Sequence, residues 1–220
     1  MIRSFALALV AVLMSVPAQA QPQLPEYYRV SGVAQNDTLT VRSGPSVESD
    51  KIGELPPDYG PIEISATNED RTWGRMAYFG TDGWVSMRYL TGVDLPRLTE
   101  TGEHGSPTGI PVGLWCGGTE PFWSFTIDGQ REVTFHDLND PQPTRIMLDE
   151  VVVAVGSMSH PVGMLGGDGT QSRVAATIRP GYCDDGMSDT TYAMTVDLWY
   201  GTDGRGPVFF SGCCRYPLPE

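Results

Sequence analysis

The chain has 220 residues, enough for two small domains after a removable leader, because a single core usually takes about 100 to 200 residues. Lys and Arg number 14 against 27 Asp and Glu, and the resulting formal net charge of −13 excludes a nucleic-acid reader and favours cationic partners. With 40% hydrophobic residues, 26 Gly and 18 Pro, we expect folded cores built from short strands and exclude a helical bundle or general disorder.

The first twenty residues have the features of a secretory signal peptide. Arg3 supplies a positive start, residues 5–14 supply an apolar run, and the AQA at 18–20 supplies the pattern that signal peptidase requires. The run is shorter than the roughly 20 residues of a membrane-spanning helix, and Pro17 breaks it. We therefore expect a mature chain that begins at Gln21, has no transmembrane span, and is periplasmic or secreted.

Residues 28–90 alternate short apolar runs with Gly, Pro and Asn or Asp turns, and sustain no helical period. Ile62 and Ile64 alternate with Glu63 and Ser65 along the chain. In the same way, Met76 and Tyr78 alternate with Arg75 and Ala77. This period of two predicts half-buried strands of a small sheet.

Three stretches carry a resemblance: LTVRSGPS (39–46), KIGELPPDYGPIEI (51–64) and TWGRMAYFGTDGWVSMRYL (72–90). In this order and spacing they resemble the bacterial SH3-like domain, over residues 21–92. The acidic, Pro-rich turn PPDYG departs from the family's usual Lys-Gly turn. The resemblance implies a small β-barrel that binds peptides or cell-wall fragments and has no catalytic activity.

Aromatic residues of this first domain are candidates for a ligand groove, because their rings offer a large contact area with a polar tip. Arg42 is a candidate partner for a carboxylate of a wall peptide. The alternative is that the rings pack in the core or at its rim and that Arg42 is solvated. The four candidate rings are Trp73, Tyr78, Trp84 and Tyr89.

Residues 91–112 are rich in Gly, Pro and Thr, and we place a linker at 93–112. Beyond it, residues 192–200 alternate strictly between apolar and other positions, which predicts a strand with one buried face. The continuous apolar run at 151–155 predicts a strand covered on both faces. Strand signals occur at 122–127, 131–136, 146–155, 173–178, 192–200 and 207–214. The fold class is therefore all-β, with six to eight antiparallel strands over 113–220 forming a barrel or a sandwich.

The four cysteines, Cys116, Cys183, Cys213 and Cys214, all lie in this second domain, and an even number in an exported chain indicates disulfide bonds. If Cys213 and Cys214 lie on a strand, their side chains point to opposite faces, so a bond between them would be strained. We expect Cys116 and Cys183 each to pair with one of the two, in either arrangement. Zinc binding or a catalytic thiol is disfavoured, because there is neither CxxC spacing nor a His close in sequence.

The stretches CGGTEPFWSFTI (116–127), CDDGMSDTTYAMTVDL (183–198) and SGCC (211–214) are similar to a family of uncharacterised bacterial envelope proteins and lipoproteins. This resemblance implies a location in the bacterial envelope, but it does not imply any particular activity. Pro121 holds Glu120 extended before an aromatic strand, so Glu120 and Trp123 are candidate ligand-binding residues.

The acidic loop DDGMSD (184–189) suits either a calcium site or capping of a turn. We favour capping, because calcium loops space their oxygens on alternating positions and this loop does not.

The histidines are His104, His136 and His160, and none lies in a catalytic motif. A weaker alternative is that the carboxyl groups of Glu120 and Asp189 act together as the catalytic pair of a glycosidase. We expect no catalytic residue, metal or cofactor.

The favoured hypothesis is an exported, non-catalytic binding protein whose SH3-like domain recognises cell-wall or protein peptides in the bacterial envelope. A second hypothesis is an acidic inhibitor of a basic enzyme such as lysozyme, because residues 93–220 carry 17 acidic residues against 7 Arg and no Lys. A third is an accessory or catalytic cell-wall hydrolase.

Overall fold

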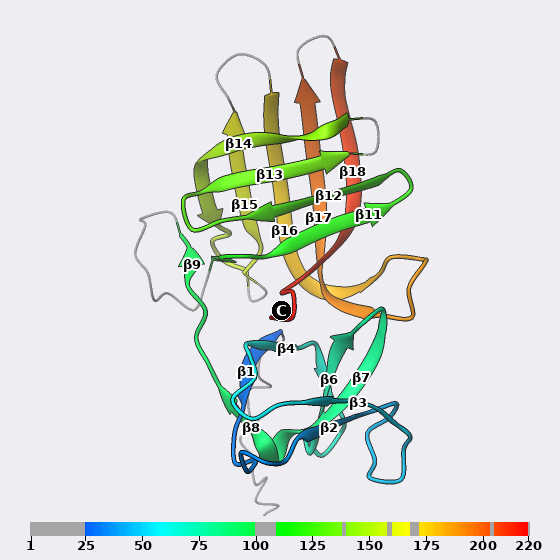
Figure 1. Ribbon diagram of the computed structural model, residues 1–220. Helices are drawn as coiled ribbons and strands as arrows, with labels where there is room; N and C mark the ends of the chain where they lie inside the picture. The colour runs from blue at the N-terminus through cyan, green and yellow to red at the C-terminus, as the bar shows by residue number, and fades with distance from the viewer. Residues whose placement is uncertain are drawn as a thin grey trace, which may run out of the picture.

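The computed structural model describes residues 25–99, 109–137, 140–157, 160–167, 172–202 and 205–219. The expected signal peptide (1–20) and His104 lie outside these residues. The chain is all-β, as predicted, and forms two units with separate hydrophobic cores. Figure 1 shows a barrel formed by the C-terminal strands above a smaller N-terminal unit.

The C-terminal strands close into an eight-stranded antiparallel barrel, which decides between the barrel and sandwich alternatives. Each strand pairs with the next, and the last pairs with the first. The strands are β11 (Trp115–Thr119), β12 (Phe122–Ile127), β13 (Glu132–Asp137), β14 (Asp140–Val153), β15 (Val162–Gly167), β16 (Ser172–Asp184), β17 (Thr191–Thr202) and β18 (Arg205–Arg215).

Side chains fill the barrel interior, as expected for a barrel of eight strands. The period of two predicted for 192–200 is confirmed from residue 194 on, because Val196, Leu198 and Tyr200 are buried while Trp199 is exposed. It fails at its start, where Tyr192 and Ala193 are both buried and Tyr192 lines the external cleft. The ring of Phe135 stacks on Tyr200 with centroids 4.2 Å apart. Such ring pairs add to the hydrophobic effect that holds the barrel closed.

Two of the barrel strands, β11 and β15, have no counterpart among the predicted strands, because both are rich in glycine and so lack an apolar alternation. These glycines are needed where backbones approach closely: a Cβ on Gly166 of β15 would lie 2.3 Å from the carbonyl oxygen of Met147 on β14. The prediction for 151–155 is wrong in extent. The strand ends at Val153, and Val155 is fully exposed in the following loop.

The N-terminal unit is built from a three-stranded and a five-stranded sheet. Its core contains Val30, Val41, Ile62, Met76 and Val85, all fully buried. The three-stranded sheet has the order β4 (Ile62–Ile64), β1 (Glu26–Val30), β8 (Leu90–Gly92). The five-stranded sheet has the order β3 (Lys51–Leu55), β2 (Leu39–Arg42), β7 (Thr81–Ser86), β6 (Trp73–Tyr78), β5 (Ala66–Thr67). A 3-10 turn, η1 (Met87–Tyr89), lies between β7 and β8. The SH3-like assignment stays a prediction.

The segment predicted as a linker is partly ordered into a two-stranded sheet of β9 (Arg97–Leu98) and β10 (Ile110–Pro111). Leu98 and Ile110 are buried and belong to the barrel core. The few apolar residues of this segment are therefore the ones that pack, and they cover one end of the barrel core.

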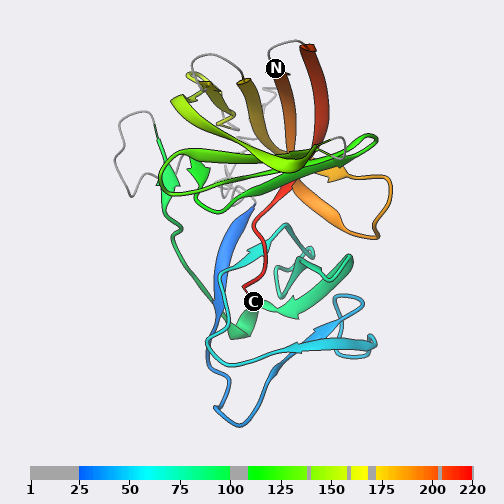
Figure 2. The same ribbon diagram turned by 45° about the horizontal axis from the view of Figure 1, so that its top comes forward.

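The C-terminal residues return to the N-terminal unit after β18 (Figure 2). The backbone N–H of Tyr216 donates to the Glu63 carboxyl at 2.8 Å, and the Tyr59 hydroxyl donates to the carbonyl of Pro219 at 2.7 Å. Leu218 packs against the N-terminal core. The last residues thus join the two units.

Candidate functional site

A cleft of about 490 Å³ lies on the outside of the barrel, where three segments that are distant in sequence meet. They are 115–124, 185–192 and the β18 residue Cys213, together with the end of β13. The lining residues are Trp115, Gly117, Gly118, Thr119, Phe122, Trp123, Ser124, His136, Asp137, Asp185, Met187, Ser188, Tyr192 and Cys213. The three stretches that carried the envelope-family resemblance thus converge on one place.

The floor of the cleft is the outer face of β11, β12 and β13. Ser124 pairs across the sheet with Gly117 on one side and His136 on the other, so all three share this face. A Cβ on Gly117 would lie 2.7 Å from the Trp115 ring, so only glycine lets that ring lie over β11. The guanidinium of Arg215 stacks 5.2 Å from the same ring and supports it.

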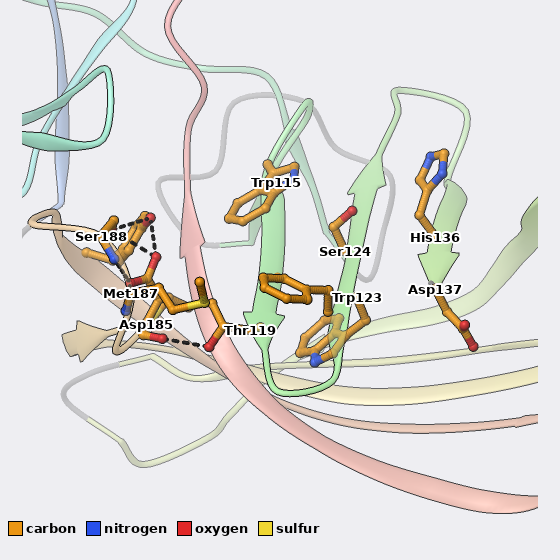
Figure 3. A pocket seen from close by; sticks show the side chains of 14 residues that line it. Trp115, Thr119, Trp123, Ser124, His136, Asp137, Asp185, Met187 and Ser188 are labelled. Atoms are coloured by element: carbon orange, nitrogen blue, oxygen red, sulfur yellow. Dashed lines mark hydrogen bonds between the residues drawn. The ribbon is translucent and has the colours of Figure 1, made fainter. Parts of the chain in front are cut away.

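The loop between β16 and β17 forms one wall, and Asp185 organises it. Its carboxylate accepts hydrogen bonds from the backbone N–H groups of Met187 and Ser188, at 3.0 and 2.8 Å, and from the hydroxyls of Ser188 and Tyr192, both at 2.9 Å. The Thr119 hydroxyl donates to the carbonyl of Asp185 at 2.7 Å and ties the loop to β11. Figure 3 shows Asp185, Met187 and Ser188 gathered beside Thr119, with His136 and Asp137 across the cleft.

The electrostatics of the loop follow from these contacts. Burial alone would raise the pKa of Asp185, but the hydrogen bonds from Ser188, Met187 and Tyr192 outweigh it and lower that pKa. Burial raises the pKa of the Tyr192 hydroxyl, and the neighbouring Asp185 raises it further. Asp185 is therefore an anion whose acceptor capacity is filled, which suits a structural role.

The expected capping role of the acidic loop agrees with this geometry, because Asp184 also accepts a backbone N–H, from Gly186 at 2.8 Å. Within the described part of the chain, no group of three or more His, Cys, Asp or Glu is placed to hold a metal ion.

Two disulfide bonds fix the strands around the cleft. Cys116 pairs with Cys214, and Cys183 pairs with Cys213. The adjacent cysteines lie on opposite faces of β18 as predicted, since Cys214 belongs to the barrel core and Cys213 lines the external cleft. The bonds are consistent with an oxidising compartment. No helix in the described part of the chain has the length and apolar character to cross a membrane.

The loop is also bonded to the N-terminal unit. The Asp82 carboxylate, on β7, accepts hydrogen bonds from the backbone N–H and the hydroxyl of Thr191, at 2.8 and 2.9 Å. The N–H of Asp82 donates to the carbonyl of Asp189 at 3.1 Å, and the N–H of Asp189 donates to the carbonyl of Gly80 at 3.2 Å. The β6–β7 hairpin therefore holds the wall of the cleft in place.

The structure divides the four candidate rings of the N-terminal unit between two faces. Tyr78 and Tyr89 pack against the core. Trp84 pairs across strands with Arg42 on β2 and with Arg75 on β6. Trp73 is two residues before Arg75 on β6, so it lies on the same outer face of the five-stranded sheet as Trp84. A single groove lined by all four rings is therefore not formed, because side chains alternate between faces along β6.

Glu120 and Trp123 also lie differently from the expectation. Glu120 lies in the tight turn between β11 and β12, and is not extended before β12 as predicted. Trp123 is only 5% exposed and stacks with Phe125 inside the barrel, leaving an edge at the cleft. Its neighbour Phe122 is 46% exposed and points outward.

Sequence reasoning missed Trp115, Phe122 and Met187. The alternation of FWSFTI contained a usable signal for Phe122, because burying Trp123 and Phe125 requires Phe122 to face out. No sequence pattern near Trp115 or Met187 indicates that the two residues are neighbours, because closure of the barrel brings them together.

Ser124 and His136 face each other across β12 and β13, which raises the question of nucleophilic catalysis. No hydrogen bond joins them, although both residues lie in the described part of the chain. Asp185 is already saturated by its four donors. What the arrangement offers is an apolar and aromatic surface with a few polar groups at its edge, which is the chemistry of a binding site.

Comparison with protein-family models, with curated proteins and with solved structures finds no match for this chain. The class of protein is thus defined by its own geometry: an all-β chain with a disulfide-bonded eight-stranded barrel and an external cleft.

Proposed function

We propose that this chain is an exported, non-catalytic binding protein of the bacterial envelope that recognises peptide segments in the barrel cleft. The observation that carries the proposal is the convergence of three distant segments on one cleft with exposed apolar side chains. A volume of about 490 Å³ falls within the range of roughly 300–1,000 Å³ typical of ligand sites.

The cleft suits a peptide because it combines two kinds of contact. Trp115 and Phe122 offer ring surface for apolar side chains, while Ser124 and His136 offer hydrogen-bonding groups for backbone amides. The loop wall is fixed by Asp185 and by the Cys183–Cys213 disulfide, so little ordering is needed when a ligand binds.

Export to the periplasm or beyond belongs to the same proposal. It is supported by the leader-like first twenty residues and by the two disulfide bonds. The outer face that carries Arg42, Trp73 and Trp84 remains a second candidate contact for wall peptides, as the SH3-like resemblance implies.

Binding by the mature chain tests the proposal, with purified peptidoglycan sacculi and an array of random heptapeptides as probes. We expect retention on sacculi or on a defined subset of peptides, and weaker retention for Trp115→Ala and Phe122→Ala. Phe209→Ala is the matched control, because Phe209 is a similarly exposed ring on β18 that does not line the cleft. No binding to either probe at low and moderate salt contradicts the proposal.

The second candidate, an inhibitor of a basic enzyme, is favoured by one observation: the side chains of Glu120, Asp184 and Asp189 are exposed close to the cleft. Such a rim attracts a positively charged protein. Adding the chain in molar excess to a basic lysozyme and following turbidity loss of a cell suspension tests it. Slower lysis supports inhibition, and unchanged lysis removes it.

A further inference from the structure

The wall of the cleft continues into the N-terminal unit. Asp189 forms a parallel bridge with Thr81, and Thr191 donates two hydrogen bonds to Asp82. Figure 1 shows the tip of the β6–β7 hairpin against the loop between β16 and β17. The loop and the hairpin tip are therefore one continuous structure, and the surface of one extends that of the other.

Both parts of this surface present a large exposed apolar side chain. Phe79, in the hairpin turn, is 84% exposed, and Met187, in the loop, is 64% exposed and lines the cleft. Phe79 also has a φ of 45°, a conformation that costs energy for a bulky residue. Its ring meets the edge of Tyr78 with centroids 4.8 Å apart, but it belongs to neither hydrophobic core and leaves most of its surface open to a partner.

Two cations near this surface have partners, because Arg215 stacks on the Trp115 ring and the Arg75 guanidinium lies 3.6 Å from the Asp82 carboxylate. Glu120, Asp184 and Asp189 are exposed and form no ion pair with a described residue. The residues that line the cleft include neither Lys nor Arg. The whole chain carries −13. A partner with positive charge beside apolar side chains complements both features.

We propose that the cleft and the tip of the β6–β7 hairpin form one recognition surface, which binds a basic polypeptide segment with apolar side chains through both units at once. This inference rests on the proposed function and adds two statements to it: the partner is cationic, and Phe79 contacts it. The Asp82–Thr191 hydrogen bonds hold the two halves of the surface in register.

Three synthetic decapeptides test the charge of the partner by calorimetric titration of the full mature chain. They alternate Lys with Leu, Lys with Ser, and Glu with Leu. We expect the Lys/Leu peptide to bind most tightly and its affinity to fall as salt is added, because the attraction between charges is screened. Equal binding of the Glu/Leu peptide overturns the inference.

The contribution of the N-terminal unit is tested with Phe79→Asn, since asparagine tolerates the positive φ and the hairpin keeps its fold. We expect affinity for the Lys/Leu peptide to fall about fivefold or more, as for an apolar residue at the centre of an interface. Val155→Asn is the control, because Val155 is fully exposed in the loop after β14 and does not line the cleft.

The outcomes separate the two proposals. Loss of affinity in both Trp115→Ala and Phe79→Asn supports the shared surface. Loss in Trp115→Ala alone overturns the shared surface and leaves the proposed function standing. No loss in either variant removes both proposals. No binding of any decapeptide overturns the shared surface alone, because the proposed function is tested separately on sacculi and heptapeptides.

Discussion

At the scale of single residues, one buried acid joins the two units and makes stability depend on pH. Glu63, in β4, is buried and accepts the N–H of Tyr216. Burial raises the pKa of this carboxyl from its ordinary 4.5 to about 8, although the Tyr216 N–H and the Arg215 guanidinium act in the opposite direction. The native protein therefore holds a proton there that the unfolded chain releases above pH 4.5.

Between pH 4.5 and 8 the free energy of unfolding should fall as pH rises, at up to about 1.4 kcal/mol per pH unit from this group, because the native state binds more protons than the unfolded state. Glu63→Gln is neutral at every pH and can still accept the Tyr216 N–H. We expect the variant to gain stability relative to the native chain across this range, measured by urea unfolding. Parallel pH profiles would contradict the assignment; Glu48→Gln, at an exposed glutamate, is the control.

At the scale of elements, the β6–β7 hairpin holds the loop between β16 and β17, and a matched pair of variants tests this. Asp82 accepts the N–H and hydroxyl of Thr191, while Asp70 accepts the N–H and hydroxyl of Thr72 within its own turn. Asp82→Ala thus removes two bonds between the units, together with the Arg75–Asp82 ion pair inside the hairpin, and Asp70→Ala removes two local bonds.

We expect Asp82→Ala to speed amide hydrogen exchange in residues 185–191 about tenfold or more, since hydrogen bonds to a charged group contribute roughly 1.5–3 kcal/mol. Asp70→Ala should leave exchange there unchanged. If exchange in the loop is equally slow in the native chain and in Asp82→Ala, the hairpin does not hold the loop.

At the scale of the whole molecule, the two disulfide bonds differ in the length of chain they close. Cys116–Cys214 spans 98 residues and joins the first and last strands of the barrel, whereas Cys183–Cys213 spans 30. In the chain-entropy model, loops of these lengths stabilise by roughly 4–5 and 3–4 kcal/mol.

Replacing both cysteines of a pair by Ala should therefore cost more for Cys116 and Cys214 than for Cys183 and Cys213, as measured by urea unfolding. The second pair has a local effect as well, because Cys213 lines the cleft and Cys183 precedes its loop wall. A smaller loss for the Cys116–Cys214 variant would show that closure of the barrel seam does not depend on that bond.

Much of the fold could be predicted from the chain itself. The period of two at 192–200 predicted which side chains enter the barrel, and Tyr200, Leu198 and Val196 do so. Tyr192, predicted on the same face, lines the external cleft instead. The strands at 115–119 and 162–167 escaped prediction because glycine carries no apolar signal, although close backbone contacts require it there. The stretches with envelope-family resemblance contained most of the cleft, while its exposed rings Trp115 and Phe122 were not among the predicted site residues.

The sequence by itself determined the all-β class, the alternation of buried and exposed side chains and the opposite directions of Cys213 and Cys214, because covalent geometry imposes these on any strand. Only the tertiary structure decided which cysteine each of them meets, which rings share a face, and that Trp115 and Met187 line one cleft. These facts depend on closure of the barrel and on its contact with the hairpin, which join residues about 100 positions apart by pairings that no local pattern encodes.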